Sequence, residues 1–198
     1  MRNKRGKLFV ISGPSGAGKS TVIEKVRKSR NDLFFSVSAT TREKRANEVH
    51  GVNYNYVSSE EFNEMIENDE LLEHVCFVGN MYGTPIIPIV EHLNQGHNVI
   101  LDLEPRGATR VKKFIPNAVS VYLTPSTFST LESRLRSRGH DTEETIQKRL
   151  RQAKIDHVKA MVYDYIIIND ELDVAVNELA AIITAEHCKT SDRINLFE

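Results

Sequence analysis

The chain has 198 residues, of which 40% are hydrophobic and 27% are charged, a composition typical of a globular protein with an apolar core. Its 26 lysines and arginines nearly balance its 27 aspartates and glutamates, and the net charge of −1 gives no general attraction to nucleic acid or to an acidic membrane. Any binding of phosphate groups must therefore come from local clusters of residues.

The sequence predicts neither a signal peptide nor a membrane span. Only residues 8–11 form an apolar run after the basic N-terminus, whereas a signal peptide needs about seven or more apolar residues there. No apolar run approaches the ~20 residues that cross a bilayer. Cys76 and Cys188 lie far apart, without metal-like spacing, which indicates two reduced thiols. Together these features predict a soluble, cytoplasmic protein.

Five short apolar runs predict the buried strands of one parallel sheet, because each run ends at a polar or turn residue and several of their residues are β-branched. These runs are Leu8–Ser12, Phe34–Ser38, Val99–Leu103, Val119–Leu123 and Tyr165–Ile168. The longer segments between them carry helical patterns, which favours βαβ units with helices on both faces of the sheet. The sequence therefore predicts an α/β fold of three layers with a central five-stranded parallel sheet.

Three later helices have legible signals. Ser58, followed three residues later by Glu61, gives a capping-box pattern, and Asp141–Glu144 gives a second helix start of the same kind. A last helix is predicted from about Asp173 to His187, where apolar residues recur on one side.

Two regions interrupt the alternation of strands and helices. Residues 39–85 combine a charged loop, short strand-like pieces and one helix, and are expected to form an inserted lobe. Residues 126–160 form two helical segments and are expected to form a helical lid. We predict one domain whose core comprises about residues 1–38, 86–125 and 161–198, with both inserted regions over the carboxyl ends of the strands, where open α/β sheets bind ligands.

Gly13–Ser20 matches the P-loop pattern G-x-x-x-x-G-K-[ST] in full, between the predicted strand Leu8–Ser12 and a helical pattern over Thr21–Ser29. Glycines let backbone N–H groups approach phosphate oxygens, and the helix N-terminus adds positive charge. Lys19 is expected to span the β- and γ-phosphates of ATP or GTP, and Ser20 to ligate Mg²⁺. A chance glycine-rich turn would lack this context. The predicted nucleotide contacts of this segment are Gly13, Pro14, Ser15, Gly16, Ala17, Gly18, Lys19, Ser20 and Thr21.

A second phosphate site is predicted in the charged loop after the second strand. Arg42 and Arg45 lie three residues apart, and Tyr54 follows them. Arginine binds phosphate bidentately and a tyrosine hydroxyl adds a neutral donor. Two phosphate sites in one protein suit phosphoryl transfer. The arginine pair by itself could equally be a solvated loop, so the wider pattern decides.

Residues 40–56 resemble the guanylate kinase signature T-[ST]-R-x-x-[KR]-x-x-[DE]-x-x-G-x-x-Y-x-[FY] at every specified position. The resemblance continues in the family's order through Leu72–His74, Gly79–Thr84, Ile100–Leu103, Leu135–Gly139 and Ile168–Asp170. It covers roughly residues 7–187. It implies a P-loop nucleoside monophosphate kinase in which residues 39–85 bind GMP, and the transfer of the γ-phosphoryl group of ATP to GMP with Mg²⁺.

The resemblance also implies roles for individual residues. The residues implied to hold the GMP phosphate are Arg42, Arg45, Tyr54 and Tyr82. Those implied to hold guanine are Ser38, Glu73 and Thr84, and further substrate contacts are implied for Gly83 and Glu104. Asp102 is implied to lie near Mg²⁺ and the acceptor. The implied catalytic set is Lys19 and Arg45 with the lid arginines Arg134, Arg138 and Arg149, while Asn169 and Asp170 are implied to lie beside adenine.

The chain departs from the family pattern after the third predicted strand. Glu104 stands where the family usually has an aspartate that helps to bind GMP, so one extra methylene must be accommodated. Arg106 adds a charge that the pattern does not include. Residues 44–48 lack the usual proline and glycine, which predicts a more mobile loop.

Two other functions stay open at this point. A catalytically inactive interaction module related to guanylate kinases would tend to lose the P-loop lysine, whereas Lys19 and Ser20 are intact. A kinase for another phosphorylated acceptor is opposed by the guanine-reading positions but allowed by Glu104. The expected partners are GMP and ATP, without nucleic acid or membrane, and the sequence leaves open whether the protein is a monomer or a homodimer.

Overall fold

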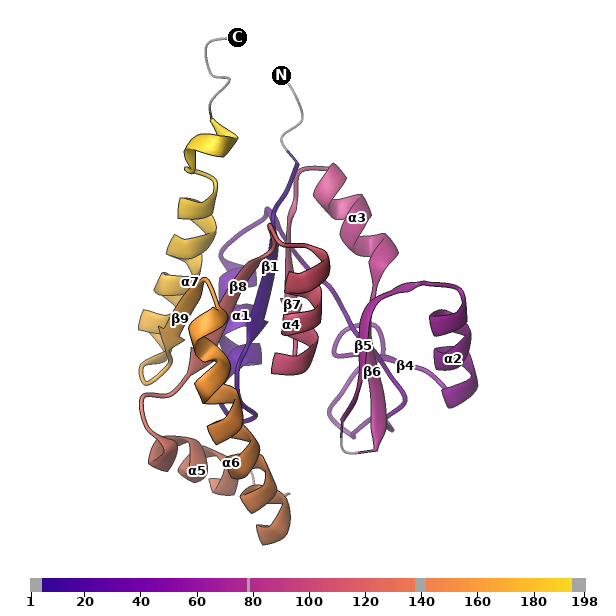
Figure 1. Ribbon diagram of the computed structural model, residues 1–198, viewed down its shortest axis with the longest axis vertical. Helices are drawn as coiled ribbons and strands as arrows, with labels where there is room; N and C mark the ends of the chain where they lie inside the picture. The colour runs from indigo at the N-terminus through magenta and orange to yellow at the C-terminus, as the bar shows by residue number, and fades with distance from the viewer. Residues whose placement is uncertain (1–4, 78, 138–141, 194–198) are drawn as a thin grey trace. The chain divides into compact units, whose positions relative to one another are not determined.

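The computed structural model describes residues 5–77, 79–137 and 142–193 and has an α/β fold with two sheets (Figure 1). The larger sheet has five strands in the order β2-β7-β1-β8-β9. These strands are β1 (Leu8–Ser12), β2 (Leu33–Phe35), β7 (Asn98–Asp102), β8 (Val119–Thr124) and β9 (Tyr165–Ile168). The pairs β1–β7, β2–β7 and β8–β9 are parallel, so the predicted five-stranded parallel sheet is confirmed.

The second strand ends earlier than the sequence predicts. The prediction was Phe34–Ser38, but β2 stops at Phe35. Ser36 still donates its N–H to the Ile100 carbonyl at 3.0 Å, whereas the Ser38 carbonyl accepts the N–H of Asn55 at 2.8 Å. The backbone therefore leaves the larger sheet within this run and begins to pair with the smaller one.

The chain forms two compact units. The first unit comprises Met1–Ser12 and Asp32–Ser120, and the second comprises Gly13–Asn31 and Val121–Glu198. Among the described residues, no helix is both long enough and apolar enough to cross a membrane.

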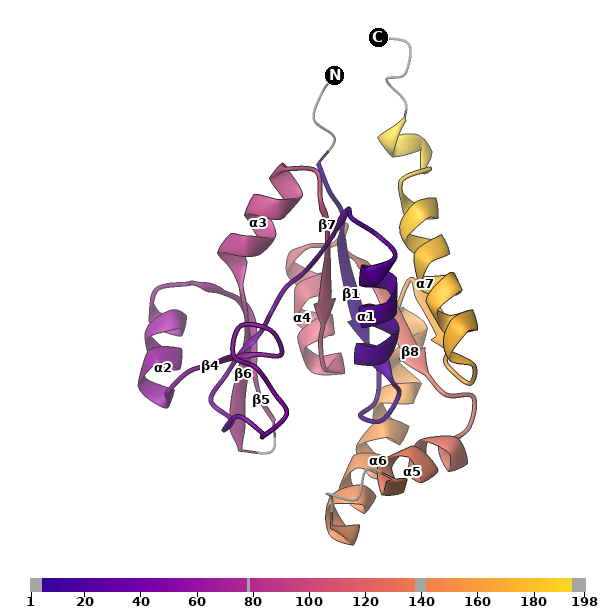
Figure 2. The ribbon, with the colours of Figure 1, turned by 180° about the vertical axis from the view of Figure 1, so that it is seen from behind.

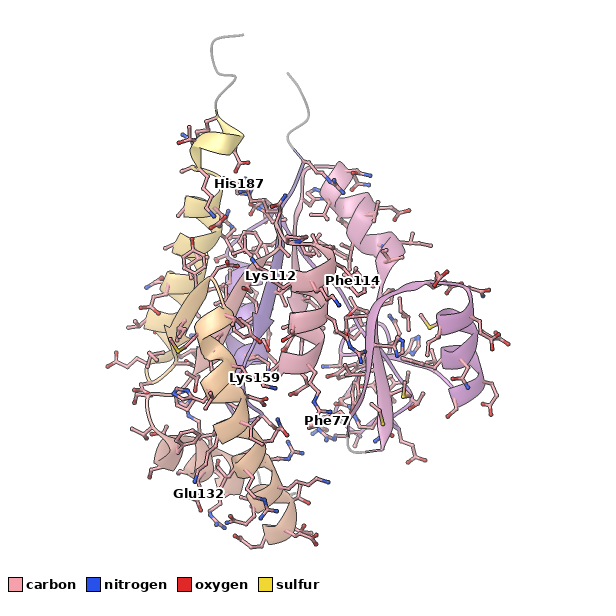
Figure 3. The ribbon with its side chains drawn as sticks, viewed as in Figure 1. Phe77, Lys112, Phe114, Glu132, Lys159 and His187 are labelled. Carbon is pink, nitrogen blue, oxygen red and sulfur yellow. The ribbon has the colours of Figure 1, made fainter. Side chains whose placement is uncertain are left out.

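In the first unit, two helices pack on strands of the larger sheet. The helix α3 (Ile86–Asn94) packs against β7, and α4 (Pro105–Phe114) packs against both β1 and β5. The helix α4 starts with proline, whose fixed φ suits the first turn, and buries Gly107, Ala108 and Val111 on one side. Near its end, Lys112, labelled in Figure 3, donates to the Ala118 carbonyl at 2.8 Å.

A smaller sheet with the order β4-β3-β6-β5 also belongs to the first unit. Its strands are β3 (Ala39–Thr40), β4 (Asn55–Tyr56), β5 (Leu71–Phe77) and β6 (Asn80–Pro85), and it is accompanied by the helix α2 (Ser59–Glu67). The fully buried Phe62 of α2 lies against Gly83 of β6. The short strands and the one helix expected within residues 39–85 are therefore present.

The capping box at the start of α2 is confirmed. The Ser58 hydroxyl accepts the N–H of Glu61 at 3.0 Å, and the Glu61 carboxylate accepts the N–H of Ser58 at 2.7 Å. Each bond satisfies a backbone N–H that the first helical turn leaves without an intrahelical partner.

The second unit contains the remaining helices (Figure 2). They are α1 (Lys19–Lys28), α5 (Phe128–Ser137), α6 (Glu143–Val158), α7 (Leu172–Glu186) and the short 3₁₀ helices η1 (Lys159–Val162) and η2 (Thr190–Asp192). The helix α1 packs beside α7, and α5 beside α6. A shared apolar cluster joins α5 and α6 and consists of Leu131, Leu135, Ile146, Leu150 and Ala153.

Two helix starts differ by one residue from the sequence pattern. The N-cap of α6 is Thr142, whose hydroxyl accepts the N–H of Thr145, so this start lacks the glutamate of a capping box. The predicted Asp141 lies outside the described residues. The helix α7 begins at Leu172 and buries Ala175, Leu179 and Ile183.

Replacement of Ser58 by alanine should lower the free energy of unfolding by about 1 kcal/mol, because one N–H of α2 loses its cap. The matched control is Ser59→Ala at the exposed first residue of the same helix. Urea denaturation of both variants measures the difference. An equal loss for Ser59→Ala would show that the cap is not the cause.

Candidate active site

The phosphate loop opens the second unit directly after β1 and leads into α1. Gly18 is the N-cap of α1 with φ 90°, a backbone conformation that side chains with a Cβ strain to adopt. A Cβ on Gly18 would also lie 2.5 Å from Nδ2 of Asn169, and one on Gly13 would lie 2.0 Å from the Leu123 carbonyl oxygen. Glycine is therefore required twice, by backbone conformation and by close packing.

The N-terminus of α1 is suited to bind an anion. Its first turn carries no acidic residue, so the positive end of the helix dipole is not neutralised there. Lys19 begins the helix, and its Nζ donates to the Gly13 carbonyl at 3.0 Å, across the loop. Ser20 and Thr21 follow on the exposed side. The loop and its lysine thus combine backbone donors with a positive side chain.

Residues from later segments of the second unit contact this loop. The buried Asn169 donates from Nδ2 to the Ala17 carbonyl at 2.7 Å. Arg134 of α5 donates to the Asn169 carbonyl at 2.8 Å and to the Ala17 carbonyl at 3.4 Å. Arg149 of α6 donates to the Ser15 hydroxyl. The structure therefore brings Asn169 and two of the predicted lid arginines to the phosphate loop.

Asp170, another predicted site residue, bonds to the turn before α5. The exposed Asp170 accepts the N–H of Ser126 at 3.0 Å, and hydrogen bonding by Ser126 lowers the pKa of its carboxyl. Asp170 thus ties the turn before α5 to the segment after β9. Arg138 lies outside the described residues.

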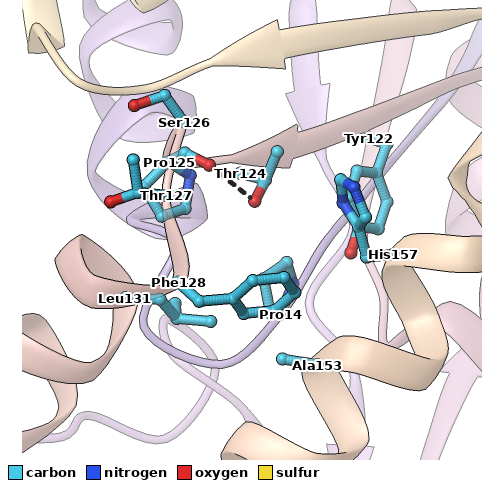
Figure 4. Close-up of a pocket in the computed structure, with 10 residues that line it drawn as sticks. All are labelled: Pro14, Tyr122, Thr124, Pro125, Ser126, Thr127, Phe128, Leu131, Ala153 and His157. Carbon is cyan, nitrogen blue, oxygen red and sulfur yellow. Dashed lines mark hydrogen bonds between the residues drawn. The ribbon is translucent and has the colours of Figure 1, made fainter.

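A small pocket lies beside the phosphate loop within the second unit (Figure 4). Pro14 is the predicted site residue that lines it, opposite Phe128 of α5. The remaining lining comes from the end of β8, the turn after it, α5 and α6, and comprises Tyr122, Thr124, Pro125, Ser126, Thr127, Leu131, Ala153 and His157. The pocket is therefore largely separate from the predicted nucleotide contacts.

The first unit holds the predicted acceptor residues, beginning with Arg42. Its guanidinium donates to both carboxylate oxygens of Glu48 at 2.8 and 3.0 Å, and lies 5.5 Å from the ring centre of Tyr54. The hydrogen bonds that Arg42 donates to the Glu48 carboxylate raise the pKa of Arg42. Burial alone would raise the pKa of Glu48, but hydrogen bonds from Arg42, the Arg45 N–H and Tyr56 bring it to about 2. This ion pair fixes Arg42, while the side chain of Arg45 is exposed.

Tyr54 links Arg42 to the end of β7. Its ring meets that of Tyr82 edge-on, with ring centres 5.8 Å apart. Burial, followed by the negative charge of Asp102 and with a smaller effect of Glu104, raises the pKa of Tyr54. Tyr54 therefore keeps its hydroxyl proton and can donate a hydrogen bond. Five predicted residues are therefore close to one another: Arg42, Tyr54, Tyr82, Asp102 and Glu104.

Glu73 is a buried carboxylate of the first unit, with only 5% of the residue exposed. It lies opposite Thr84 in the β5–β6 pair, and its Oε1 accepts the Thr84 hydroxyl at 2.8 Å. Its Oε2 is buried without a hydrogen-bond partner among the residues that the structure describes. A Cβ on Gly107 would lie 2.7 Å from this oxygen. Burial raises the pKa of Glu73.

Two other predicted guanine-side residues have structural contacts. Gly83 is buried, and a Cβ there would lie 2.7 Å from Cδ1 of Leu71 and 2.9 Å from Cζ of Phe62. The half-buried Ser38 joins β2 to β3 and pairs through its carbonyl with Asn55. Gly83 therefore allows α2 to pack closely on the strand that carries Thr84.

The guanylate kinase family model matches residues 5–186 of the chain. The chain belongs to the guanylate kinase family. It is 48% identical to a guanylate kinase of Carboxydothermus hydrogenoformans over 191 residues, covering 96% of this chain and 93% of that protein, and 46% identical to one of Halalkalibacterium halodurans over 189 residues, with the same coverage. The crystal structure of a guanylate kinase from Anaplasma phagocytophilum superposes with a TM-score of 0.78 at 29% identity, covering 94% of this chain and 89% of that one.

This guanylate kinase family member has contacts at its candidate site that the sequence reasoning did not assign. Glu48 was a signature position without a role, yet it binds Arg42. Gly107 has no role assigned from the sequence, yet it lies against Glu73. Arg110 carried no signal at all, although it contacts the strand that holds Glu73.

Replacement of Gly18 by alanine should destabilise the second unit more than Gly51→Ala destabilises the first. Both substitutions place alanine at positive φ, 90° and 77°, which costs about 1–2 kcal/mol. At Gly18 the Cβ must also displace Asn169 from the Ala17 carbonyl, which adds about 1–3 kcal/mol, whereas nothing lies within 4 Å of a Cβ at Gly51.

Urea denaturation of the two glycine variants measures this difference. Equal losses of stability would mean that Asn169 is not held as described.

Proposed function

We propose that this protein transfers the γ-phosphoryl group of ATP to GMP and produces ADP and GDP. The observation that carries the proposal is the Glu73 carboxylate, buried beside Thr84 with one oxygen that lacks a partner among the described residues. Guanine presents two adjacent donors, N1–H and the 2-amino group, and an ionised carboxylate is an acceptor only. Binding of guanine would therefore satisfy an oxygen whose isolation otherwise costs free energy.

The acceptor phosphate would be held by Arg42, Arg45, Tyr54 and Tyr82. Arg42 and Tyr54 are held near each other, and Tyr54 keeps the proton that it would donate. The exposed side chain of Arg45 would supply a second guanidinium. Ser38 and Thr84 would complete the recognition of guanine. Glu104 would contact GMP, and its negative charge also raises the pKa of Tyr54.

The donor nucleotide would be held by Gly13–Thr21, with adenine beside Asn169 and Asp170. Lys19 would bind the β- and γ-phosphates, and Arg134, Arg138 and Arg149 would stabilise the charge of the transferring group. Arg134 and Arg149 already contact Ala17 and Ser15, next to the phosphates' expected position.

The reaction would be an in-line transfer without a covalent enzyme intermediate. A phosphate oxygen of GMP attacks the γ-phosphorus of ATP, the bond to the bridging oxygen breaks, and ADP leaves. The GMP phosphate is already anionic, so no strong general base is needed. We also propose residues 39–85 as the GMP-binding lobe and residues 126–160 as the lid, whose closure would exclude water and prevent hydrolysis of ATP.

Mg²⁺ would be held by the Ser20 hydroxyl and the Asp102 carboxylate together with the phosphates of ATP. No group of three or more histidine, cysteine, aspartate or glutamate residues in the described part of the chain could hold a metal ion. The available donors fit Mg²⁺, which takes few protein oxygens and retains substrate phosphates and water as ligands. When bound, Mg²⁺ neutralises charge that develops on the phosphate oxygens.

A coupled assay of ADP release with GMP, AMP, UMP and dTMP tests the proposal. GMP should be the preferred acceptor. Preference for another acceptor would favour a different monophosphate kinase. Absence of turnover with all four, together with binding of GMP, would favour an interaction module.

Replacement of Lys19 by alanine should reduce kcat by roughly 10³–10⁵, because this charge stabilises the transferring phosphoryl group. The fold should persist, because Lys19 is half-exposed and its side chain bonds to a loop carbonyl, that of Gly13, and is not part of the apolar core. Steady-state kinetics with circular dichroism checks both statements. Lys25→Ala, on the exposed face of α1, is the matched control. Retention of more than about a tenth of the activity would contradict the assigned transfer geometry.

Replacement of Glu73 by glutamine should lower kcat/KM for GMP strongly and narrow the preference for GMP over AMP. Sites that depend on such hydrogen bonds discriminate by roughly 10⁴–10⁵, because the wrong base leaves buried groups unpaired. Adenine places the lone pair of its N1 against the carboxylate, which is repulsive. The measurement is kcat/KM for both acceptors with both proteins. An unchanged ratio would mean that Glu73 does not read the base.

A further inference from the structure

The helix α4 carries a positive side chain to the strand that holds Glu73. The guanidinium of Arg110 donates to the carbonyl of His74, the residue after Glu73 in β5. The helix packs against β5, and Gly107, three residues before Arg110, lies against the Glu73 carboxylate. Residues three apart share a helix face, so Gly107 gives the close approach and Arg110 anchors the same face to the strand.

The Glu73 carboxylate needs such a charge. Among the described residues its one hydrogen-bond donor is the neutral hydroxyl of Thr84, and its Oε2 has none. A buried carboxylate with so few donors favours the protonated form. Accordingly, burial raises the pKa of Glu73, the Thr84 hydroxyl lowers it, and the charge of Arg110 lowers it further.

Among the described charged groups on the elements around β5, Arg110 is the one whose charge shifts the pKa of Glu73. On α4, Lys112 donates to the Ala118 carbonyl, while Arg106 and Lys113 are exposed. The negative charges of Asp102 and Glu104 raise the pKa of Tyr54. The neighbouring strand β6 contributes Thr84, which is neutral. Within the part of the chain that the structure describes, Arg110 is the charged residue that acts on Glu73.

We propose that Arg110 is a positioning residue that keeps Glu73 ionised and thereby sets the choice of base. The inference rests on the proposed function, because it assigns Glu73 to guanine. An ionised Glu73 accepts both guanine donors, whereas a protonated Glu73 turns one oxygen into a donor that opposes N1–H of guanine. The same donor suits the unprotonated N1 of adenine. Loss of Arg110 should therefore weaken the use of GMP and favour AMP as the pH falls.

The pH dependence of kcat/KM tests this inference. The carboxylate is the active form for GMP, so kcat/KM for GMP falls as the pH decreases through the pKa of Glu73. Arg110→Gln removes the charge but retains a donor for the His74 carbonyl. It should move this acid limb to higher pH, by less than the loss of a fully buried ion pair would because Arg110 is exposed. Below that pKa, the ratio of kcat/KM for GMP to that for AMP should fall about threefold to tenfold relative to the original protein.

Two variants serve as controls. Arg110→Lys retains the charge and should restore the original acid limb. Lys113→Gln removes one charge from an exposed position of the same helix and should leave the limb unchanged. An unshifted limb in Arg110→Gln, or an equal shift in Lys113→Gln, would overturn the inference.

A direct titration separates this inference from the proposed function. Carbon-13 NMR of the Glu73 carboxyl in the protein without nucleotide should show the same upward shift of its pKa in Arg110→Gln, and no shift would overturn the inference. Failure of the original protein to phosphorylate GMP would instead overturn the proposed function, and the NMR titration would still decide whether Arg110 controls Glu73.

Discussion

The burial of one carboxylate, that of Glu73, is the constraint on which the acceptor site depends. A buried charge is tolerated only with compensating donors or charges, and here each comes from a different element. The β5–β6 register supplies the Thr84 hydroxyl, and α4 supplies the charge of Arg110. Gly107 has no Cβ and so lets the helix approach the carboxylate. In the proposed function, the remaining buried oxygen would accept an N–H of guanine.

In the second unit, contacts from several elements meet at one backbone carbonyl, that of Ala17. The Ala17 carbonyl accepts hydrogen bonds from Asn169 and Arg134, which a carbonyl with two lone pairs can do. It thereby joins the phosphate loop to the segment after β9 and to α5. A displacement of α5 would have to break the bond of Arg134, so the position of this helix and the phosphate loop are energetically coupled.

The loop proposed to bind the acceptor phosphate is organised by contacts within the protein. Arg42 is bonded to Glu48 and to the carbonyl of Glu43, and lies beside the rings of Tyr54 and Tyr56. In the proposed function, such preorganisation would reduce the entropy lost on binding, and the GMP phosphate would share the Arg42 guanidinium with Glu48. The low pKa of Glu48 keeps this ion pair intact over the physiological pH range.

The sequence by itself determined the features that depend on local order. Gly13–Ser20 required a loop between a strand and a helix, and the five apolar runs gave the strands of the larger sheet, because these signals lie within a few consecutive residues. The order of motifs identified the family. Only the tertiary structure decided where β2 ends, which oxygen of Glu73 lacks a donor, and that Arg110 acts on it. These facts depend on contacts between segments far apart in the chain, such as α4 with β5, which no local pattern records.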